Sequence, residues 1–216
     1  MDDTRLDKAH AAMEAASDDA KARLRFYETL AASELFLMLR AEPEGDQLDP
    51  EVFDLGDQSF VLVFDREDRL AQFAGRAVPY AALTGRSIAS VLAGQGIGLG
   101  INLDVAPSAI LLPPEAVGWL AETLSEAPSQ IEAKPQAFSA PKGLPESFLV
   151  ALDARLATMA GLARMAYLVG VTYDTGAQGH MLGVVGADPV AHAALARAVS
   201  EALIFSGLEA AALDVA

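Results

Sequence analysis

The sequence contains no cysteine among its 216 residues. Disulfide bonds, thiolate catalysis and zinc or iron–sulfur sites with cysteine ligands are therefore excluded. Basic residues are scarce as well: 15 lysines and arginines stand against 30 aspartates and glutamates, which gives a formal charge of −15. Because nucleic acids and anionic lipids are bound by basic side chains, this composition argues against both classes of partner.

Long apolar runs and leader features are missing too. No run approaches the roughly 18 apolar residues that a membrane-spanning helix needs. The N-terminus has no basic segment followed by an apolar one, which a secretory signal would require. These features predict a cytoplasmic protein with no membrane partner. Aromatic residues make up only 6% of the chain although 52% of it is hydrophobic, which favours helices packed on a sheet over a β-sandwich.

The order of apolar segments predicts an α/β (α+β) fold with two domains. Residues 1–126 alternate helical patterns with β-prone runs such as 60–64 (FVLVF), so we expect an N-terminal α/β domain with a mixed sheet. Four prolines lie between residues 126 and 146, and we interpret 127–144 as a proline-rich linker. Residues 145–216 predict a small α-β-β-α-β domain that contains a hairpin.

Residues 94–102 (GQGIGLGIN) carry four glycines and raise the question of a phosphate-binding loop. A dinucleotide fingerprint requires G-x-G-x-x-G between a strand and a helix. The registers that start at Gly94 and Gly96 both place a bulky residue at the last glycine position, and no Lys-Ser or Lys-Thr follows. Period-two alternation puts Gly98 and Gly100 on one face of a strand. We therefore predict a strand whose glycine face allows close packing, for example by a helix, and no nucleotide cofactor.

Seven acidic residues and no basic one lie between residues 41 and 58. They are Glu42, Glu44, Asp46, Asp49, Glu51, Asp54 and Asp57. Their spacing does not match a calcium-binding loop. We interpret residues 42–57 as a solvated loop and hairpin edge, with a dock for a basic partner as the functional alternative.

The three histidines and the single tryptophan give no catalytic pattern. His10, His180 and His192 lie on separate predicted elements without i, i+4 pairing. We expect them at surface or boundary positions, with no metal site. Trp119 lies on a predicted helix, where a core or domain-contact position is the usual one.

Ser87 is the one candidate nucleophile. The stretch 85–89 (GRSIA) follows a predicted strand and opens a predicted helix, as a nucleophile elbow does, although Ala89 replaces its final glycine. His180 or His192 with a downstream acid would complete a serine hydrolase triad. The competing interpretation is that Thr84 and Gly85 cap a helix and Ser87 lies in its first turn.

Several segments resemble the SseB family of enhanced-serine-sensitivity proteins. They are FVLVFDREDRLAQFAGRAVPYAALTGRSIASVLAG, GIGLGINLDVAPSAILLPPEAVGWL, AYLVGV and GHMLGVVG. The resemblance covers most of residues 5–190, and its motifs are structural: a VF strand, a PY strand and a PPE helix start. It implies an N-terminal α/β domain, a smaller C-terminal domain, and a cytoplasmic bacterial protein without established catalytic residues.

The residues and the resemblance together predict a non-catalytic protein-interaction or regulatory module without cofactor or metal. The alternative is a serine-dependent hydrolase that uses Ser87. The expected partner is a protein or a second copy of the chain. The hairpin strand 165–173 and the edge strand 211–215 are candidates for strand addition, and the acids of 42–57 favour encounters with basic surfaces.

Overall fold

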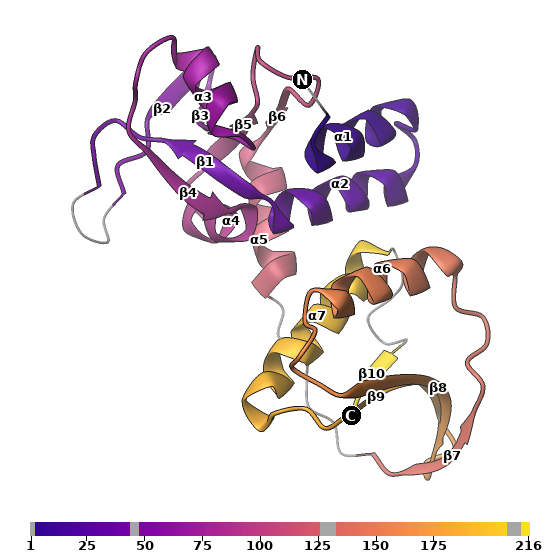
Figure 1. Ribbon diagram of the computed structural model, residues 1–216. Coiled ribbons are helices and arrows are strands. Elements are labelled where there is room, and N and C mark those ends of the chain that lie inside the picture. Colours follow the sequence, from indigo (N-terminus) through magenta and orange to yellow (C-terminus); the bar gives the residue numbers. More distant parts are fainter. Residues whose placement is uncertain (1–2, 44–47, 126–132, 207–212) are drawn as a thin grey trace. The chain divides into compact units, whose positions relative to one another are not determined.

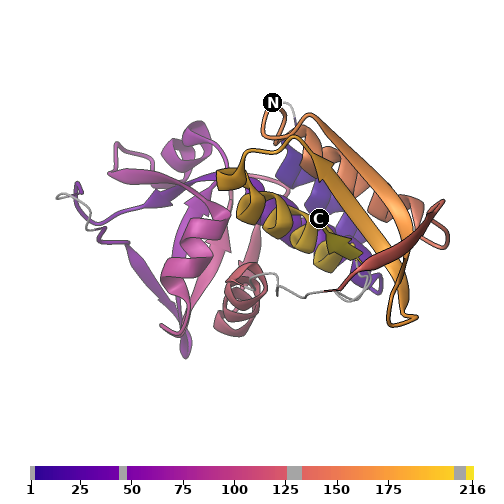
Figure 2. The same cartoon turned by 90° about the horizontal axis from the view of Figure 1, so that it is seen from below.

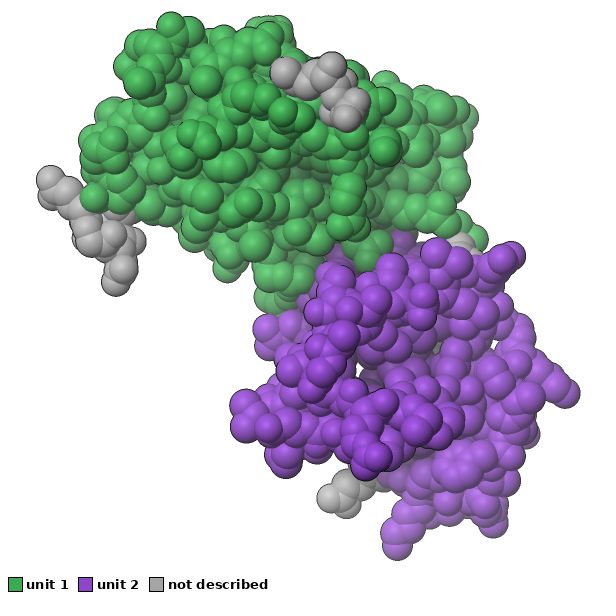
Figure 3. All heavy atoms as spheres, in the orientation of Figure 1, with its two compact units in different colours: residues 1–125 green, residues 126–216 purple. Residues whose placement is uncertain are grey.

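The computed structural model describes residues 3–43, 48–125, 133–206 and 213–216, and the chain divides into two compact units, residues 1–125 and 126–216 (Figure 3). The helices and strands of the first unit are α1 Arg5–Ala15, α2 Ala20–Ala32, β1 Glu34–Met38, β2 Val52–Leu55, β3 Gln58–Phe64, α3 Glu67–Ala74, β4 Tyr80–Thr84, α4 Gly85–Leu92, β5 Ile97–Ile101, β6 Ile110–Leu112 and α5 Pro114–Ser125. Those of the second unit are β7 Pro135–Ser139, α6 Glu146–Ala157, β8 Met165–Tyr173, β9 Gln178–Val185, η1 Pro189–Ala191, α7 His192–Phe205 and β10 Leu213–Val215.

The described strands of the first unit form one mixed sheet in the order β4-β1-β3-β5-β6. β2 also pairs with β3, along the same edge of β3 as β1. β3 and β5 are parallel, with Ser59 opposite Ile97 and Val63 opposite Ile101. β1 is antiparallel to both of its neighbours. The mixed sheet expected from the sequence is confirmed.

Helices cover both faces of this sheet (Figure 1). On one face, Leu70 of α3 packs with Met38, Leu62 and Phe64. α3 ends at Gly75, whose φ of 62° gives the left-handed C-cap that glycine favours. On the opposite face lie α4 and α5, and the helical pair α1–α2 packs beside α4.

The glycines of β5 make room for side chains of the neighbouring strand. A Cβ at Gly98 would lie 2.5 Å from the Phe60 ring, and a Cβ at Gly100 would lie 2.6 Å from a methyl group of Leu62. The strand and its crowded glycine face are as predicted. The crowding comes from neighbouring strands and not from a packed helix. Phe60 and Leu62 of β3 lie directly opposite the two glycines in the parallel register, and the Leu112 carbonyl oxygen of β6 would lie 2.6 Å from a Cβ at Gly98.

The second unit is a four-stranded sheet in the order β10-β9-β8-β7, with α6 and α7 on one face (Figure 1). Its core joins Phe148 and Leu152 of α6 to Val199 and Leu203 of α7 over Leu182 of β9. The α-β-β-α-β order predicted for residues 145–216 is present. The end of the last predicted strand lies in β10, and residues 211–212 lie outside the described part.

The segment 127–144 is not a plain linker. Residues 126–132 lie outside the described part, but Pro135–Ser139 form β7, which pairs antiparallel with the end of β8. Proline is tolerated there because β7 is an edge strand, where one side of the backbone needs no ladder hydrogen bond. The proline content that indicated a linker thus conceals a strand.

Within the described residues, the structure contains no helix that is both long enough and apolar enough to cross a membrane.

Candidate functional site

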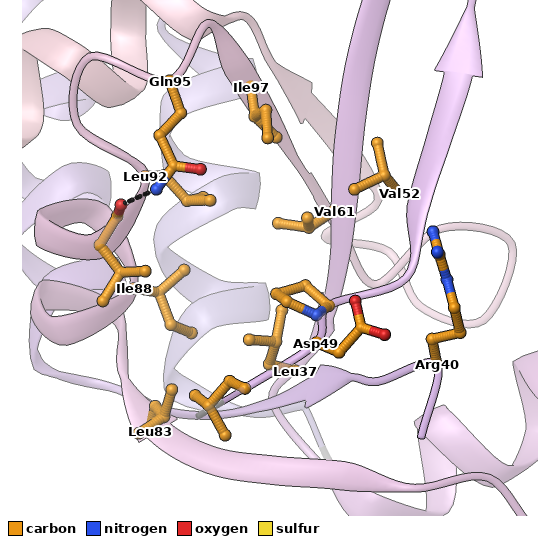
Figure 4. Close-up of a pocket in the computed structure, with 13 residues that line it drawn as sticks. Leu37, Arg40, Asp49, Val52, Val61, Leu83, Ile88, Leu92, Gln95 and Ile97 are labelled. Atoms are coloured by element: carbon orange, nitrogen blue, oxygen red, sulfur yellow. Dashed lines mark hydrogen bonds between the residues drawn. The ribbon is translucent and has the colours of Figure 1, made fainter. Parts of the chain in front are cut away.

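A pocket of about 240 Å³ opens in the first unit between α4 and the chain segment 48–52 (Figure 4). Strands β1, β3, β4 and β5 and the inner side of α4 supply its aliphatic lining. The main lining residues are Leu37, Val61, Leu83, Ile88, Leu92 and Ile97. Three polar side chains also line it, those of Arg40, Asp49 and Gln95. The pocket is therefore suited to an apolar group and has charge at one side.

Helix α4 forms one wall because of its local sequence. Ile88 and Leu92, four residues apart, turn inward, whereas Val91 is 54% exposed at the rim. The Gln95 side-chain amide donates a hydrogen bond of 2.5 Å to the Val91 carbonyl (Figure 4). Gly94, directly before Gln95 in the chain, has a φ of 73°, and this left-handed conformation turns the chain back toward β5. The rim at Val91 is thus held by the turn that follows it.

The opposite wall is fastened to β1. The Arg40 N–H donates to the Asp49 carbonyl at 2.9 Å, and the Glu51 N–H donates to the Met38 carbonyl at 3.1 Å. A single antiparallel bridge joins Leu39 and Pro50 between them. Both charged side chains, those of Arg40 and Asp49, remain exposed. This wall is a short backbone ladder with an ionic outer edge.

The acidic stretch continues from this wall into a hairpin. β2 and β3 pair antiparallel around a turn at Gly56, whose φ is 68°. Of the acids in the stretch, Glu42, Asp49, Asp54 and Asp57 are exposed and Glu51 is half-buried. Glu44 and Asp46 lie outside the described residues. The hairpin edge expected for residues 42–57 is present, and it lies next to the pocket.

Ser87 lies in the first turn of α4. Its backbone N–H donates to the Thr84 hydroxyl at 3.2 Å, and the two hydroxyl oxygens are 2.8 Å apart. Thr84 is the helix N-cap. A Cβ at Gly85 would lie 2.1 Å from the Leu30 carbonyl oxygen, so contact with α2 accounts for this glycine without a nucleophile elbow. Ser87 and its surroundings form a helix start.

The histidines and the tryptophan lie on four different elements: His10 on α1, Trp119 on α5, His180 on β9 and His192 on α7. His180 and His192 belong to the second unit, where His180 Nε2 is 2.9 Å from the Lys142 carbonyl oxygen and His192 is exposed. His10 is buried, contrary to the surface or boundary position expected, and its ring meets Phe26 edge-on at 5.7 Å. Trp119 is exposed and contacts the Tyr27 ring. In the described part of the chain, no group of three or more potential ligands is arranged for a metal ion.

A buried polar cluster lies where the parallel strands β3 and β5 end. Arg69 of α3 donates to both carboxylate oxygens of Asp7, at 3.0 and 2.5 Å, and to Asp65 at 2.8 Å. The Ser108 hydroxyl donates to Asp7 at 2.5 Å and accepts from the Asn102 amide at 2.8 Å. Sequence reasoning missed this cluster, because its members are up to 101 residues apart in the chain.

The electrostatics of the cluster indicate a fixed ion pair. Burial alone would raise the pKa of Asp7, but the hydrogen bonds from Arg69, Ser108 and the Thr4 backbone hold it well below its usual range. The hydrogen bond to Asp7 raises the pKa of Arg69. Ligands of α/β sheets commonly bind at the carboxyl ends of parallel strands. In this chain the Asp7 carboxylate of helix α1 occupies that position, at the carboxyl ends of β3 and β5.

The family comparison applies mainly to the first unit. Residues 6–119 match the family model described as the SseB protein N-terminal domain. No curated protein and no solved structure was found to match the chain.

Proposed function

The chain belongs to the SseB family, and from that premise we propose that it is a non-catalytic protein-interaction module. Its N-terminal unit binds a partner segment that places one apolar side chain in the pocket beside α4 and carries basic residues next to it. The observation that carries this proposal is the open aliphatic pocket with an acidic wall.

The size of the pocket favours a side chain over a cofactor. Sites for small molecules and cofactors commonly measure about 300–1,000 Å³, whereas this pocket measures about 240 Å³. A dry cavity of about 150 Å³ is large enough for benzene. One aromatic or leucine side chain of a partner therefore fits, and a dinucleotide does not.

The surrounding charge favours a basic partner. Asp49 lines the pocket, and Glu51, Asp54 and Asp57 follow it along the chain. Complementary charge speeds encounter and disfavours partners of the wrong sign. Arg40 is the one basic residue among the lining residues, so it restricts where on the wall a partner's cation can lie. A Lys or Arg of the partner is best placed on the β2 side.

Three features support a role without catalysis. The Ser87 hydroxyl lies beside the capping hydroxyl of Thr84. The carboxylate of Asp7, in the polar cluster, is paired with Arg69 inside the protein. The polar residues that line the pocket, Arg40, Asp49 and Gln95, do not form a nucleophile with an adjacent base.

A peptide titration tests the proposal. Short peptides with one leucine or phenylalanine between lysines are compared with peptides in which glutamates replace the lysines, and amide shifts of the full chain are followed by NMR. We expect saturable shifts at Val91, Val52 and Ile97 with the basic peptides only. Val91→Lys should abolish them, because it places a cation at the apolar rim, where it is costly to desolvate and repels the lysines of the peptide.

Leu111→Lys is the matched control, since Leu111 is also an exposed aliphatic residue, at 39%, but lies on β6 outside the pocket lining. It should leave the titration unchanged. Equal shifts with both peptide classes, or binding that survives Val91→Lys, would contradict the proposed site.

A further inference from the structure

Strand β8 of the second unit has one edge that β7 covers only in part. β8 pairs with β9 from Met165 to Thr172. β7 pairs with β8 only from Gly170 to Tyr173, and Figure 2 shows β7 as a short strand near one end of β8. Among the described residues, nothing pairs with 165–169 on the β7 side. These five residues of β8 are an open strand edge.

The backbone of the open edge presents hydrogen-bonding groups outward. The Tyr173 N–H donates to the Ala177 carbonyl of the β9 side at 2.9 Å. Alternation along an antiparallel strand then turns the odd-numbered residues of β8 toward β9 and the even-numbered ones away from it. The N–H and C=O groups of Ala166 and Leu168 therefore point to the open side. After Ser139 the chain leaves this edge, and the Lys142 carbonyl lies 2.9 Å from His180 Nε2 of β9.

The open edge lacks the usual protection against pairing. Natural edge strands carry charged residues, prolines or bulges that discourage a second chain. The β8 sequence MAYLVGVTY and the β9 sequence QGHMLGVV contain no Asp, Glu, Lys, Arg or Pro. Met165 and Tyr167 are 52% and 51% exposed on the face opposite α6 and α7. In so acidic a chain, an unpaired strand edge without charged residues indicates a contact site for another strand.

We propose that the occupant is a second copy of this chain, with residues 165–169 of the two copies paired antiparallel about a two-fold axis at Tyr167. In this register Ala166 of each copy exchanges backbone hydrogen bonds with Leu168 of the other. The two Tyr167 rings are direct cross-strand neighbours, and Met165 lies opposite Val169. Aromatic and aliphatic cross-strand pairs of this kind stabilise antiparallel sheets.

Charge selects this edge for self-association. Two chains with a formal charge of −15 each repel one another, so they approach most easily where neither has charge. A two-fold contact must also be self-complementary, and pairing 165–169 with itself places only uncharged side chains opposite each other. A five-residue contact is smaller than the roughly 1,600 Å² of a standard interface. The dimer is therefore weak and dependent on concentration.

Sedimentation of the full chain at rising concentration, with charge variants at Tyr167, tests the register. The average mass of the unsubstituted chain, called the parent below, should rise from 22.6 kDa toward twice that value. Tyr167→Lys and Tyr167→Glu should each stay monomeric, because like charges meet on the axis. A 1:1 mixture of the two variants should associate at least as well as the parent. Val190→Lys, at a residue 90% exposed in η1, is the control and should associate like the parent.

Hydrogen exchange gives a second readout that needs no variant. Amide protection of Ala166 and Leu168 should increase with protein concentration, whereas that of Val150, on the exposed side of α6, should not. A parent that stays monomeric throughout overturns the proposal. So does a mixture of the Tyr167 variants that fails to associate, or protection at Ala166 that is independent of concentration.

Discussion

Asp7→Ala and Arg69→Met test whether the buried cluster fastens α1 to the sheet. Asp7 accepts hydrogen bonds from Arg69, from Ser108 and from the Thr4 backbone N–H at 2.9 Å. The side chains of Asp7 and Arg69 are 2% and 3% exposed. Either substitution therefore leaves charged or polar groups without partners in the interior, where water does not replace them.

The two substitutions differ in the charge they leave behind. Removing one member of a buried ion pair costs about 3–5 kcal/mol. After Asp7→Ala, Arg69 keeps Asp65 at 2.8 Å, so we expect the lower end, about 3 kcal/mol. After Arg69→Met, the Asp7 and Asp65 carboxylates lose their shared cation, and we expect about 5 kcal/mol.

Urea unfolding followed by tryptophan fluorescence measures these losses. The chain has a single tryptophan, Trp119 of α5, so the signal reports on the first unit alone even if the two units unfold separately. Asp68→Ala is the matched control. It breaks an exposed Arg66–Asp68 pair with a distance of 2.6 Å, and it should leave the unfolding midpoint within error of the parent.

The pH dependence should reverse between parent and variant. In the parent the pKa of Asp7 is depressed, so its contribution is complete above the unfolded value of about 3.9 and is lost as the pH falls below it. In Arg69→Met two neighbouring carboxylates without a cation favour protonation, so acidification from pH 7 to pH 5 should stabilise that variant. Equal losses for Asp7→Ala and Asp68→Ala, or no reversal, would refute the reasoning.

Four further substitutions test other parts of the structure. Gly98→Val should destabilise the first unit by about 1–3 kcal/mol through contact with Phe60, whereas Gly118→Ala, at a helical site with open space, should stabilise it by about 0.5–1 kcal/mol. A serine-directed fluorophosphonate should not label the chain, and labelling that disappears in Ser87→Ala would restore the hydrolase. Burial and a neighbouring carboxylate raise the pKa of Tyr173 to about 12. Its stabilising effect should therefore be complete below about pH 10 and decline toward 12, and absorbance that titrates near pH 10 and is missing from Tyr173→Phe would argue against this.

Periodicity in the sequence was sufficient for most of the fold because each long element has a clear apolar face. The glycine strand and the 165–185 hairpin both follow from local patterns. β7 escaped prediction because its small residues and the prolines in and around it resemble a linker. Only its partner β8 makes it a strand, and pairing across sequence is not a local property.

The candidate sites were harder to predict than the fold for the same reason. Asp7 and Thr4 form a capping box at the start of α1. Nothing nearby in the sequence indicates that the Asp7 carboxylate also meets Arg69, 62 residues away. The pocket likewise draws its wall from residues 48–52 and its rim from Val91. The acidic composition of 42–57 was visible in the sequence, but its place beside an apolar pocket was not.

The two proposed contacts respond to salt in opposite directions, and this separates them. Binding of a basic segment at the acidic wall depends on attraction between opposite charges, so added salt should raise its Kd. Pairing of two uncharged edges is opposed by repulsion between chains of −15, so the same salt should lower the Kd of self-association. Both constants can be measured on one preparation between about 0.01 and 0.3 M NaCl, where the screening length falls from about 30 Å to below 10 Å. If salt weakens both, self-association also depends on opposite charges, and the neutral edge of β8 is not the contact.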